Sequence, residues 1–197
     1  YEADLPARSG LVTSSSFAVG LLNAFHALKG QYADARHLAD EAIHLERVLC
    51  NEAGGVQDQI SAAFGGMNKI TFSAEGYEVE PVIISAERKN QLNENLLLYF
   101  TGLSRFSSDI QTSTQKSIEE KTAQLLEMLH LVNDAEKVLT GQNADLDEFG
   151  RLLDYTWRLK RGIDRQISTD TIDALYEKAK RAGALGGKLL GAGGGGF

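Results

Sequence analysis

A run of four hydroxyl residues at the start of an apolar helical pattern constrains the fold of this chain most. The run is Thr13–Ser16; it follows a loop that contains Pro6 and Gly10, and apolar residues recur at helical spacing through Ser14–Leu28. Serine and threonine favour the N-terminal boundary of a helix because their oxygens accept backbone N–H groups there. The sequence therefore predicts a helix over residues 14–28 whose first turn offers N–H donors and a positive dipole end to an anion such as phosphate.

Two interpretations of the hydroxyl run remain open on the residues alone. The first is a well-capped helix that binds no ligand. The second is an anion site, for which Gly10 supplies the flexible backbone before the helix, and where a hydroxyl could bind the magnesium that accompanies a nucleotide. The run is not a Walker A loop, because the pattern GxxxxGK[ST] does not occur in the chain.

Composition narrows the class of protein. The chain has 197 residues, 43% of them hydrophobic and 24% charged, which predicts a globular protein of one large or two small domains. Its net charge of −7 argues against a general nucleic-acid or membrane-surface binder, which needs a basic face. The single cysteine, Cys50, excludes an internal disulfide and fits a reducing compartment. We therefore expect a cytoplasmic protein without nucleic-acid or membrane partners.

The first segment of the chain, to about Ser85, mixes helical and strand patterns. Apolar spacing and flanking glycines predict helices over 33–49 and 57–64 and strands over 67–72 and 77–84, joined by a turn at 74–76. In the second predicted helix, Leu38, Ala42, Leu45 and Leu49 share one face.

The second segment is mainly helical, with strand patterns at its two ends. We predict helices over 109–139, 146–161 and 170–182, the last capped by Thr169, and strands over 96–100 and 185–190. The expected architecture is therefore α/β or α+β, with two units, 1–85 and 86–197, that meet at a cleft.

A second candidate site combines Glu46 with Asp58. Asp58 lies between the amides Gln57 and Gln59, shortly after a Gly–Gly turn, where its carboxylate could act as a base on a substrate hydroxyl. The alternative is an aspartate that only caps a helix, because Asp58 stands at a plausible helix start.

The glycine run Gly191–Gly196 is a third candidate. It formally satisfies GxGxxG, but neither a following helix nor an acidic residue about 20 positions later is present in the chain, so a dinucleotide fold is not indicated. Glycines in a row let the backbone approach another loop or a ligand closely, and the flanking apolar residues favour order over a flexible linker. Lys160, Arg161 and Lys188 could bind a substrate phosphate, although a solvated helix end is the alternative for the first two.

The four histidines show no metal-binding spacing in the sequence. His37 and His44 are seven positions apart on one predicted helix, and no HExxH motif occurs. We expect His26, His37, His44 and His130 to be structural or solvated.

The three candidate sites, in this order, resemble the motifs of the GHMP kinase superfamily. The matching residues are Pro6, Gly10, Leu11 and Ser14 for its P-x-x-x-G-L-G-S-S motif, Gly55-Val56-Gln57-Asp58-Gln59 for its acidic site, and Gly191–Gly196 for its glycine loop. Strings such as DLPARSGL, LDEFGRLL and GALGGKLLGAGGGGF look most like its bacterial heptose 7-phosphate kinases. The resemblance covers nearly the whole chain, and it implies the two-domain GHMP fold truncated at both ends, because the chain begins without Met and stops inside a motif.

The resemblance also implies an activity and a set of site residues. The expected reaction transfers the γ-phosphate of ATP, with Mg²⁺, to the anomeric hydroxyl of D-glycero-D-manno-heptose 7-phosphate, giving the 1,7-bisphosphate. The phosphates of ATP would contact Gly10, Leu11, Val12, Thr13, Ser14, Ser15 and Ser16. Ser14 and Glu46 would bind magnesium, and Asp58 would face the attacking hydroxyl. The sugar phosphate would contact Arg8, Lys188, Gly193, Gly194 and Gly195.

One departure from the family pattern concerns the phosphate loop itself. Val12 stands where the family has glycine, and a β-branched residue resists the positive φ that glycine tolerates.

Two alternatives to a heptose kinase remain open. One is another GHMP sugar-1-kinase, such as an L-fucokinase domain. The other, which Val12 motivates, is a silent sensor that binds nucleotide and sugar without transfer. A monomer or a homodimer is expected.

Overall fold

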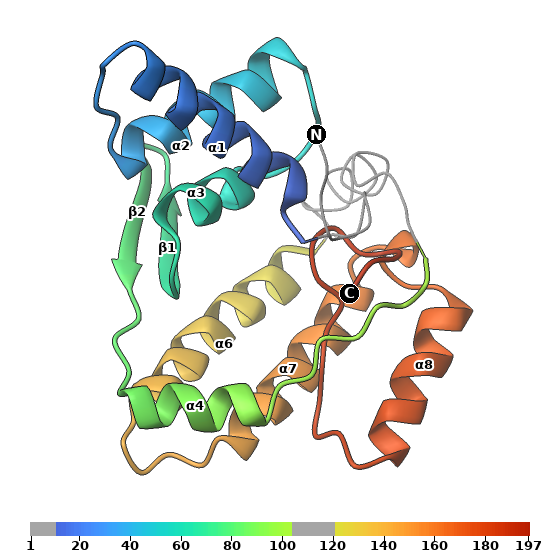
Figure 1. The fold of residues 1–197 in the computed structure, drawn as a ribbon. Coiled ribbons are helices and arrows are strands. Elements are labelled where there is room, and N and C mark those ends of the chain that lie inside the picture. Colours follow the sequence, from blue (N-terminus) through green and yellow to red (C-terminus); the bar gives the residue numbers. More distant parts are fainter. Residues whose placement is uncertain (1–10, 104–120) are drawn as a thin grey trace. The chain divides into compact units, whose positions relative to one another are not determined.

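The computed structural model describes residues 11–103 and 121–197, which form two compact units, each with its own core (Figure 1). The units comprise Val12–Val82 and Ile83–Phe197. The boundary that we expect after residue 85 stays a prediction. Among the helices that the structure describes, none combines the length and the apolar character needed to cross a bilayer.

The first unit packs three helices and a π-helical turn around a core of small side chains. In order these elements are α1 (Thr13–Leu28), α2 (Ala35–Ile43), η1 (His44–Leu49) and α3 (Gln57–Phe64). Its buried core consists of Ala18, Val19, Leu38 and Ala42. Small residues at the α1–α2 contact let the two helices approach closely, whereas Phe17, Leu21, Phe25 and Leu28 remain exposed on α1.

Helix α1 begins one residue earlier than the sequence predicts, and its hydroxyls do not cap it. The N-cap is Val12, with φ 59° and ψ 21°, and its own side chain makes no capping hydrogen bond. The expectation of a serine or threonine cap is therefore wrong, because the four hydroxyl residues occupy the first helical turn itself. Ser16 N donates to Val12 O at 2.9 Å, which is the first bond of the helix.

The helix predicted over 33–49 is instead α2 followed by the π-helical η1. Asp34 caps α2 by accepting from His37 N at 2.8 Å. In η1 the backbone bonds reach five residues, as from Cys50 N to Leu45 O. The wider turn rotates the following residues off the buried face, so Leu49 is exposed although its spacing matches that of Leu38.

A β-hairpin completes the first unit. β1 (Asn68–Ser73) pairs antiparallel with β2 (Gly76–Pro81), with Ile70 opposite Val79, which confirms the predicted hairpin. Tyr77 fastens the hairpin to α2: its hydroxyl donates to Asp40 Oδ1 at 2.7 Å, and the Arg36 guanidinium lies 4.3 Å from its ring centroid.

The second unit consists mainly of helices around a buried tryptophan. Its described elements are α4 (Ala86–Glu94), α6 (Thr122–Thr140), α7 (Asp147–Arg161), the 3₁₀ turn η3 (Arg165–Ile167) and α8 (Asp170–Arg181). The predicted helices over 146–161 and 170–182 are confirmed, and Thr169 caps α8 by accepting from Ile172 N at 3.3 Å. The core contains Trp157, Ile163, Ile167, Ile172 and Leu189. The first part of the helix predicted over 109–139 lies outside the described residues.

Helix α4 has no counterpart in the sequence prediction. Ser85 caps it by accepting from Arg88 N at 3.1 Å. The Arg88 guanidinium then donates to Val138 O in the last turn of α6 and to Ala144 O in the loop that follows, both at 2.7 Å. One side chain thus satisfies a carbonyl that the helix end leaves without a partner and a second carbonyl in the next loop.

The two strands predicted in the second unit are wrong. Residues 96–100 and 185–190 form no ladder with any other described segment, and Leu97 is 97% exposed. The 185–190 segment lies against α7 instead, and Gly186 approaches the carbonyl of Gly150 so closely that a Cβ would clash. Apolar runs form strands only where a partner edge is available, and α7 provides none.

Candidate functional site

A buried carboxylate lies where α1, η1 and α3 meet in the first unit. Ser15 Oγ donates to Glu46 Oε2 at 2.8 Å, and Gln59 Nε2 donates to the same oxygen. We call these three residues the Glu46 cluster. Their exposed fractions are 2%, 5% and 0%. A charge buried this deeply requires hydrogen bonds to offset its lost hydration, and the two donors supply them.

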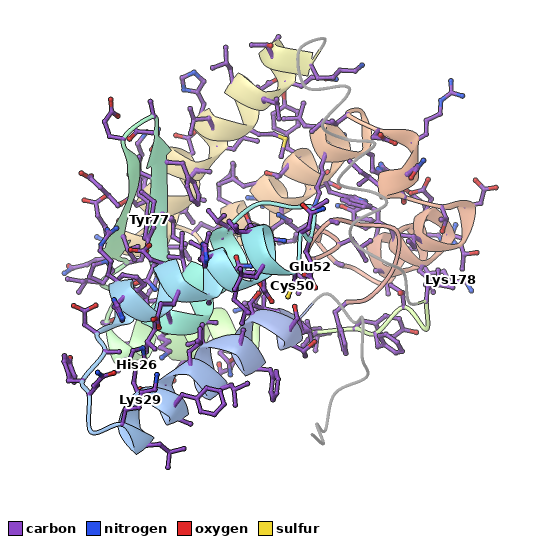
Figure 2. All side chains as sticks on the ribbon, turned by 90° about the horizontal axis from the view of Figure 1, so that it is seen from above. His26, Lys29, Cys50, Glu52, Tyr77 and Lys178 are labelled. Atoms are coloured by element: carbon purple, nitrogen blue, oxygen red, sulfur yellow. The ribbon has the colours of Figure 1, made fainter. Side chains whose placement is uncertain are left out.

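The π-helical turn η1 positions Glu46 in the cluster. Single π-turns within helices cost regular hydrogen bonding and occur frequently at functional sites. Glu46 lies in the first turn of η1, and its carbonyl accepts from Glu52 N at 2.9 Å. The chain leaves the turn at Cys50, whose thiol is free and exposed. Figure 2 labels Cys50 and Glu52 beside this turn.

The loop between η1 and α3 is held by Arg47. Its guanidinium donates to Glu52 O and Ala53 O, both at 3.2 Å, and to Gly55 O at 2.7 Å. Three carbonyls on one planar group fix the course of the loop up to the start of α3. Arg47 thereby sets the position of Asp58, which is in the first turn of that helix.

Asp58 has an environment that disfavours its charged form. Partial burial raises the pKa of its carboxyl above the ordinary 3.8, and the nearby Glu46 carboxylate raises it further. The Arg47 guanidinium and a hydrogen bond from Gln57 oppose this effect without cancelling it. A carboxylate whose pKa is raised by burial beside a second acidic group is a typical candidate for a general base.

The hydroxyl run points in two directions. Ser15 faces inward to Glu46, whereas Ser14 and Ser16 are exposed on the first turn of α1. Arg8 and Gly10 lie outside the described residues. Val12 adopts the left-handed conformation, which is the positive φ expected at this position from its place in the motif. The structure thus brings Ser15, rather than Ser14, into contact with Glu46.

The donor atoms of the Glu46 cluster fit a hard cation. Glu46 and the serine hydroxyls offer only oxygen, which is the ligand type that magnesium prefers. Gln59 Oε1 is buried and has no hydrogen-bond partner in the described part of the chain, so an acceptor oxygen remains available beside Glu46.

The glycine run forms a buried loop in the second unit. Gly194 N donates to Ile167 O at 2.8 Å, and Gly196 N donates to Leu103 O at 2.7 Å. A Cβ on Gly193 would lie 2.7 Å from the Ile167 carbonyl oxygen, so only glycine permits this approach. The run is therefore an ordered loop packed against two other segments, and not a flexible linker.

Two lysines accompany the glycine loop. Lys160 Nζ donates to Gly191 O at 2.6 Å. Burial lowers the pKa of Lys160 to about 8, and the charge of Lys188 contributes; burial likewise lowers the pKa of Lys188. Both Lys160 and Arg161 are half-buried at the end of α7, and Arg161 bonds Asp173 at 2.9 Å and lies over the Trp157 ring. Two neighbouring, partly desolvated ammonium groups favour an anion between them.

Comparison with known protein families finds two matches along the chain. The description "GHMP kinases N terminal domain" matches residues 1–66, which include the Glu46 cluster and Asp58, and "GHMP kinases C terminal" matches residues 135–197, which include the glycine loop. The chain belongs to the GHMP kinase superfamily.

Several GHMP kinases are similar over nearly the whole chain. The D-glycero-alpha-D-manno-heptose 7-phosphate kinase of Campylobacter jejuni is 32% identical over 99% of this chain and 58% of its own length. The L-fucokinase/L-fucose-1-P guanylyltransferase of Bacteroides fragilis is 29% identical over 99% of this chain and 21% of its own length. The chain thus spans less than two thirds of either relative.

Solved GHMP kinase structures share the fold. A D-glycero-D-manno-heptose 1-phosphate kinase from Bacteroides thetaiotaomicron superposes with a TM-score of 0.71 at 29% identity, covering 96% of this chain and 53% of that one. The mixed helix-and-strand GHMP fold predicted from the sequence is confirmed.

Sequence reasoning missed part of the site of this GHMP kinase. No sequence pattern gives Arg47 a role, although it holds the loop before Asp58, and the pattern marks Gln59 only as a neighbour of Asp58. The Gln-Asp-Gln sequence is the one pattern that could have indicated the role of Gln59. Adjacent residues on a helix point about 100° apart, so an amide next to Asp58 can contact a different residue, here Glu46.

Proposed function

We propose that this GHMP kinase transfers the γ-phosphate of ATP to the anomeric hydroxyl of D-glycero-D-manno-heptose 7-phosphate. The observation that carries the proposal is the Glu46 cluster, in which Ser15 from the first turn of α1 bonds Glu46. Asp58 is close enough for the Glu46 carboxylate to contribute to its raised pKa. The heptose kinase of C. jejuni, at 32% identity, supports this choice of substrate.

The first turn of α1 supplies the proposed phosphate site. The helix begins at Val12, which has no capping side chain, and its first turn presents N–H groups and a positive dipole end to the ATP phosphates. In this proposal residues 10–16 contact the phosphates, and Glu46 and Ser14 hold Mg²⁺. When bound, the metal neutralises charge on the β- and γ-phosphates. The hydrogen bond from Ser15 keeps Glu46 oriented toward that helix end.

Asp58 is the proposed base. Its carboxylate accepts the proton of the anomeric hydroxyl as that oxygen forms a bond to the γ-phosphorus, and the bond from the γ-phosphorus to the bridging oxygen breaks to release ADP. The raised pKa of Asp58 brings its proton affinity closer to that needed at neutral pH. On the second unit, Lys188 and the glycines Gly193, Gly194 and Gly195 contribute contacts to the sugar phosphate, together with Arg8.

The proposal is tested by replacing Asp58 in the protein and measuring ATP-dependent phosphorylation of heptose 7-phosphate. We expect Asp58→Ala to lower kcat by at least about a hundredfold, the usual contribution of a positioned base. The matched control is Asp134→Ala, which removes an exposed aspartate from α6 and should leave kcat unchanged. Activity of Asp58→Ala within a few-fold of wild type would exclude the assigned role.

A panel of sugars with and without a terminal phosphate tests the substrate. The fucokinase relative of B. fragilis favours L-fucose as the second candidate. A heptose kinase should prefer the sugar that carries the 7-phosphate, whereas a fucokinase should phosphorylate L-fucose and ignore the phosphorylated heptose.

Val12 supports one further candidate, a sensor that binds nucleotide and sugar without phosphate transfer. Its left-handed backbone at the proposed phosphate loop carries a β-branched side chain that could crowd the phosphates. If that is so, the wild type is nearly inactive and Val12→Gly raises kcat by tenfold or more. Good turnover by the wild type, unchanged in Val12→Gly, excludes the sensor.

A further inference from the structure

Two histidines and a glutamate that take no part in the Glu46 cluster meet on the first unit. His26 Nε2 lies 2.6 Å from Glu41 Oε2, and His37 Nε2 lies 3.4 Å from Glu41 Oε1. The two imidazole rings are 5.2 Å apart, centroid to centroid, in an edge-to-face arrangement. One ring nitrogen of each histidine and a carboxylate oxygen of Glu41 lie within 4.8 Å of one another.

Two helices supply these three side chains. His26 is in the last turn of α1, where Figure 2 labels it, and His37 and Glu41 are one turn apart on α2. Leu38 and Ala42, the residues that follow them, are buried in the α1–α2 contact. The packing therefore holds the three donors at fixed separations, and Asp34 fixes the start of α2 by bonding His37 N. The donors converge across a rigid interface and do not depend on a loop.

The donor set determines which ion fits. Two imidazole nitrogens and one carboxylate oxygen form the His₂Glu set that binds Zn²⁺, with a fourth position free for water. Imidazole suits zinc and its transition-metal neighbours, whereas Mg²⁺ prefers oxygen. The side chains of His37 and Glu41 are 53% and 35% exposed, so solvent reaches the site and an ion can enter.

We propose that His26, His37 and Glu41 form a Zn²⁺ site that links α1 to α2. No motif in the sequence indicates this site because one ligand comes from a different helix. The ion replaces the contacts that the two imidazoles make with Glu41. The side chains of His37 and Glu41, the more exposed of the three, rotate to make room for it, and His26, whose side chain is 16% exposed, stays in place. Because α1 carries Ser15 and α2 leads into η1 with Glu46, a bound ion restrains α1 and the start of η1, two of the three elements that build the Glu46 cluster.

Calorimetric titration with ZnCl₂ tests the proposal. The protein is first freed of metal with a chelator and then titrated in excess Mg²⁺, which occupies oxygen-only sites such as that at Glu46. We expect one Zn²⁺ per chain. His37→Ala and Glu41→Gln should each weaken binding by about tenfold or more, since even loss of an outer partner of a ligand costs that much. The matched control is His44→Ala, which removes an exposed histidine seven positions later and should bind like wild type.

Thermal unfolding gives an independent measurement. An ion that binds only the folded state raises Tm. Zn²⁺ should therefore raise the Tm of the wild type and of His44→Ala, and should raise the Tm of His37→Ala much less. Because His37 is half exposed, its replacement leaves the core intact, which circular dichroism checks. The proposal is overturned if the wild type binds no Zn²⁺ in excess Mg²⁺, or if His37→Ala binds it as tightly as His44→Ala does.

Discussion

At Val12 the backbone adopts a conformation that its own side chain disfavours. A β-branched residue with φ 59° carries strain of roughly 1–3 kcal/mol, and such strain persists only where the surrounding structure enforces it. Here it occurs at the residue before the first turn of α1, where the proposed phosphate loop meets the helix. Together with the π-turn at Glu46, it places two unfavourable backbone features in one site, which is typical of functional sites.

Asp58 adds an electrostatic cost to the same region. Because burial raises its pKa in the folded state above the ordinary 3.8, the folded protein binds this proton more tightly than the unfolded chain does. The contribution of Asp58 to stability is therefore fully present below pH 3.8 and is lost as the pH rises through the raised value. We predict that Asp58→Asn is more stable than the wild type at neutral pH.

The decisive measurement is how the difference in free energy of unfolding between Asp58→Asn and the wild type depends on pH. Urea unfolding of the two proteins, from neutral to acidic pH, should show the advantage of Asp58→Asn shrinking as the pH falls, since the wild-type carboxyl then becomes neutral too. A difference that stays constant across this range, or that favours the wild type at neutral pH, would contradict the assigned environment of Asp58.

At the scale of elements, the glycine loop depends on close backbone approach. A Cβ on Gly195 would lie 2.8 Å from Leu103 O, a contact with backbone that cannot rotate away. We predict that Gly195→Ala lowers the free energy of unfolding by about 1–3 kcal/mol, the usual cost of overpacking. Chemical denaturation measures this loss.

The control for this substitution is Gly187→Ala in the segment that leads to the loop. Its Cβ would lie 3.8 Å from Tyr176 Cε2, which is ordinary van der Waals contact. Gly187→Ala should therefore change stability little. Equal effects of the two substitutions would mean that the loop tolerates a shift away from Leu103.

The elements differ in how well the sequence predicts them. The bounds of α3 follow directly from the sequence, because two glycines stop the apolar pattern at Gly65. Helix α4 could not be found in this way: its nine residues are mostly polar, and its anchor, Arg88, binds carbonyls about 50 residues away. The 185–190 segment has the composition of a strand, but tertiary packing against α7 decides its conformation.

The same distinction holds for the candidate site. Asp58, Glu46 and the glycine loop could be named from their order in the chain. Which serine contacts Glu46 could not, because adjacent residues on a helix point about 100° apart and the packing of α1 against η1 decides which of them faces inward. The meeting of His26 with Glu41 depends on how two helices pack, so no local pattern contains it.

For the whole molecule, the proposed reaction draws on both units. Asp58 and the Glu46 cluster belong to Val12–Val82, and the glycine loop with Lys160 and Lys188 belongs to Ile83–Phe197. The net charge of −7 repels phosphorylated substrates at long range. Lys160 and Lys188 beside the glycine loop provide local positive charge on a protein that is acidic overall, and because burial lowers the pKa of both, a bound anion would favour their charged forms.

Cys50 gives this protein a single chemical handle at the proposed site. It is the one cysteine in the sequence, its thiol is exposed, and it directly follows the π-turn that contains Glu46. A thiol-reactive fluorophore would therefore attach at one position, without prior mutagenesis. Its emission would report movement of the Glu46 turn in real time as nucleotide or metal is added.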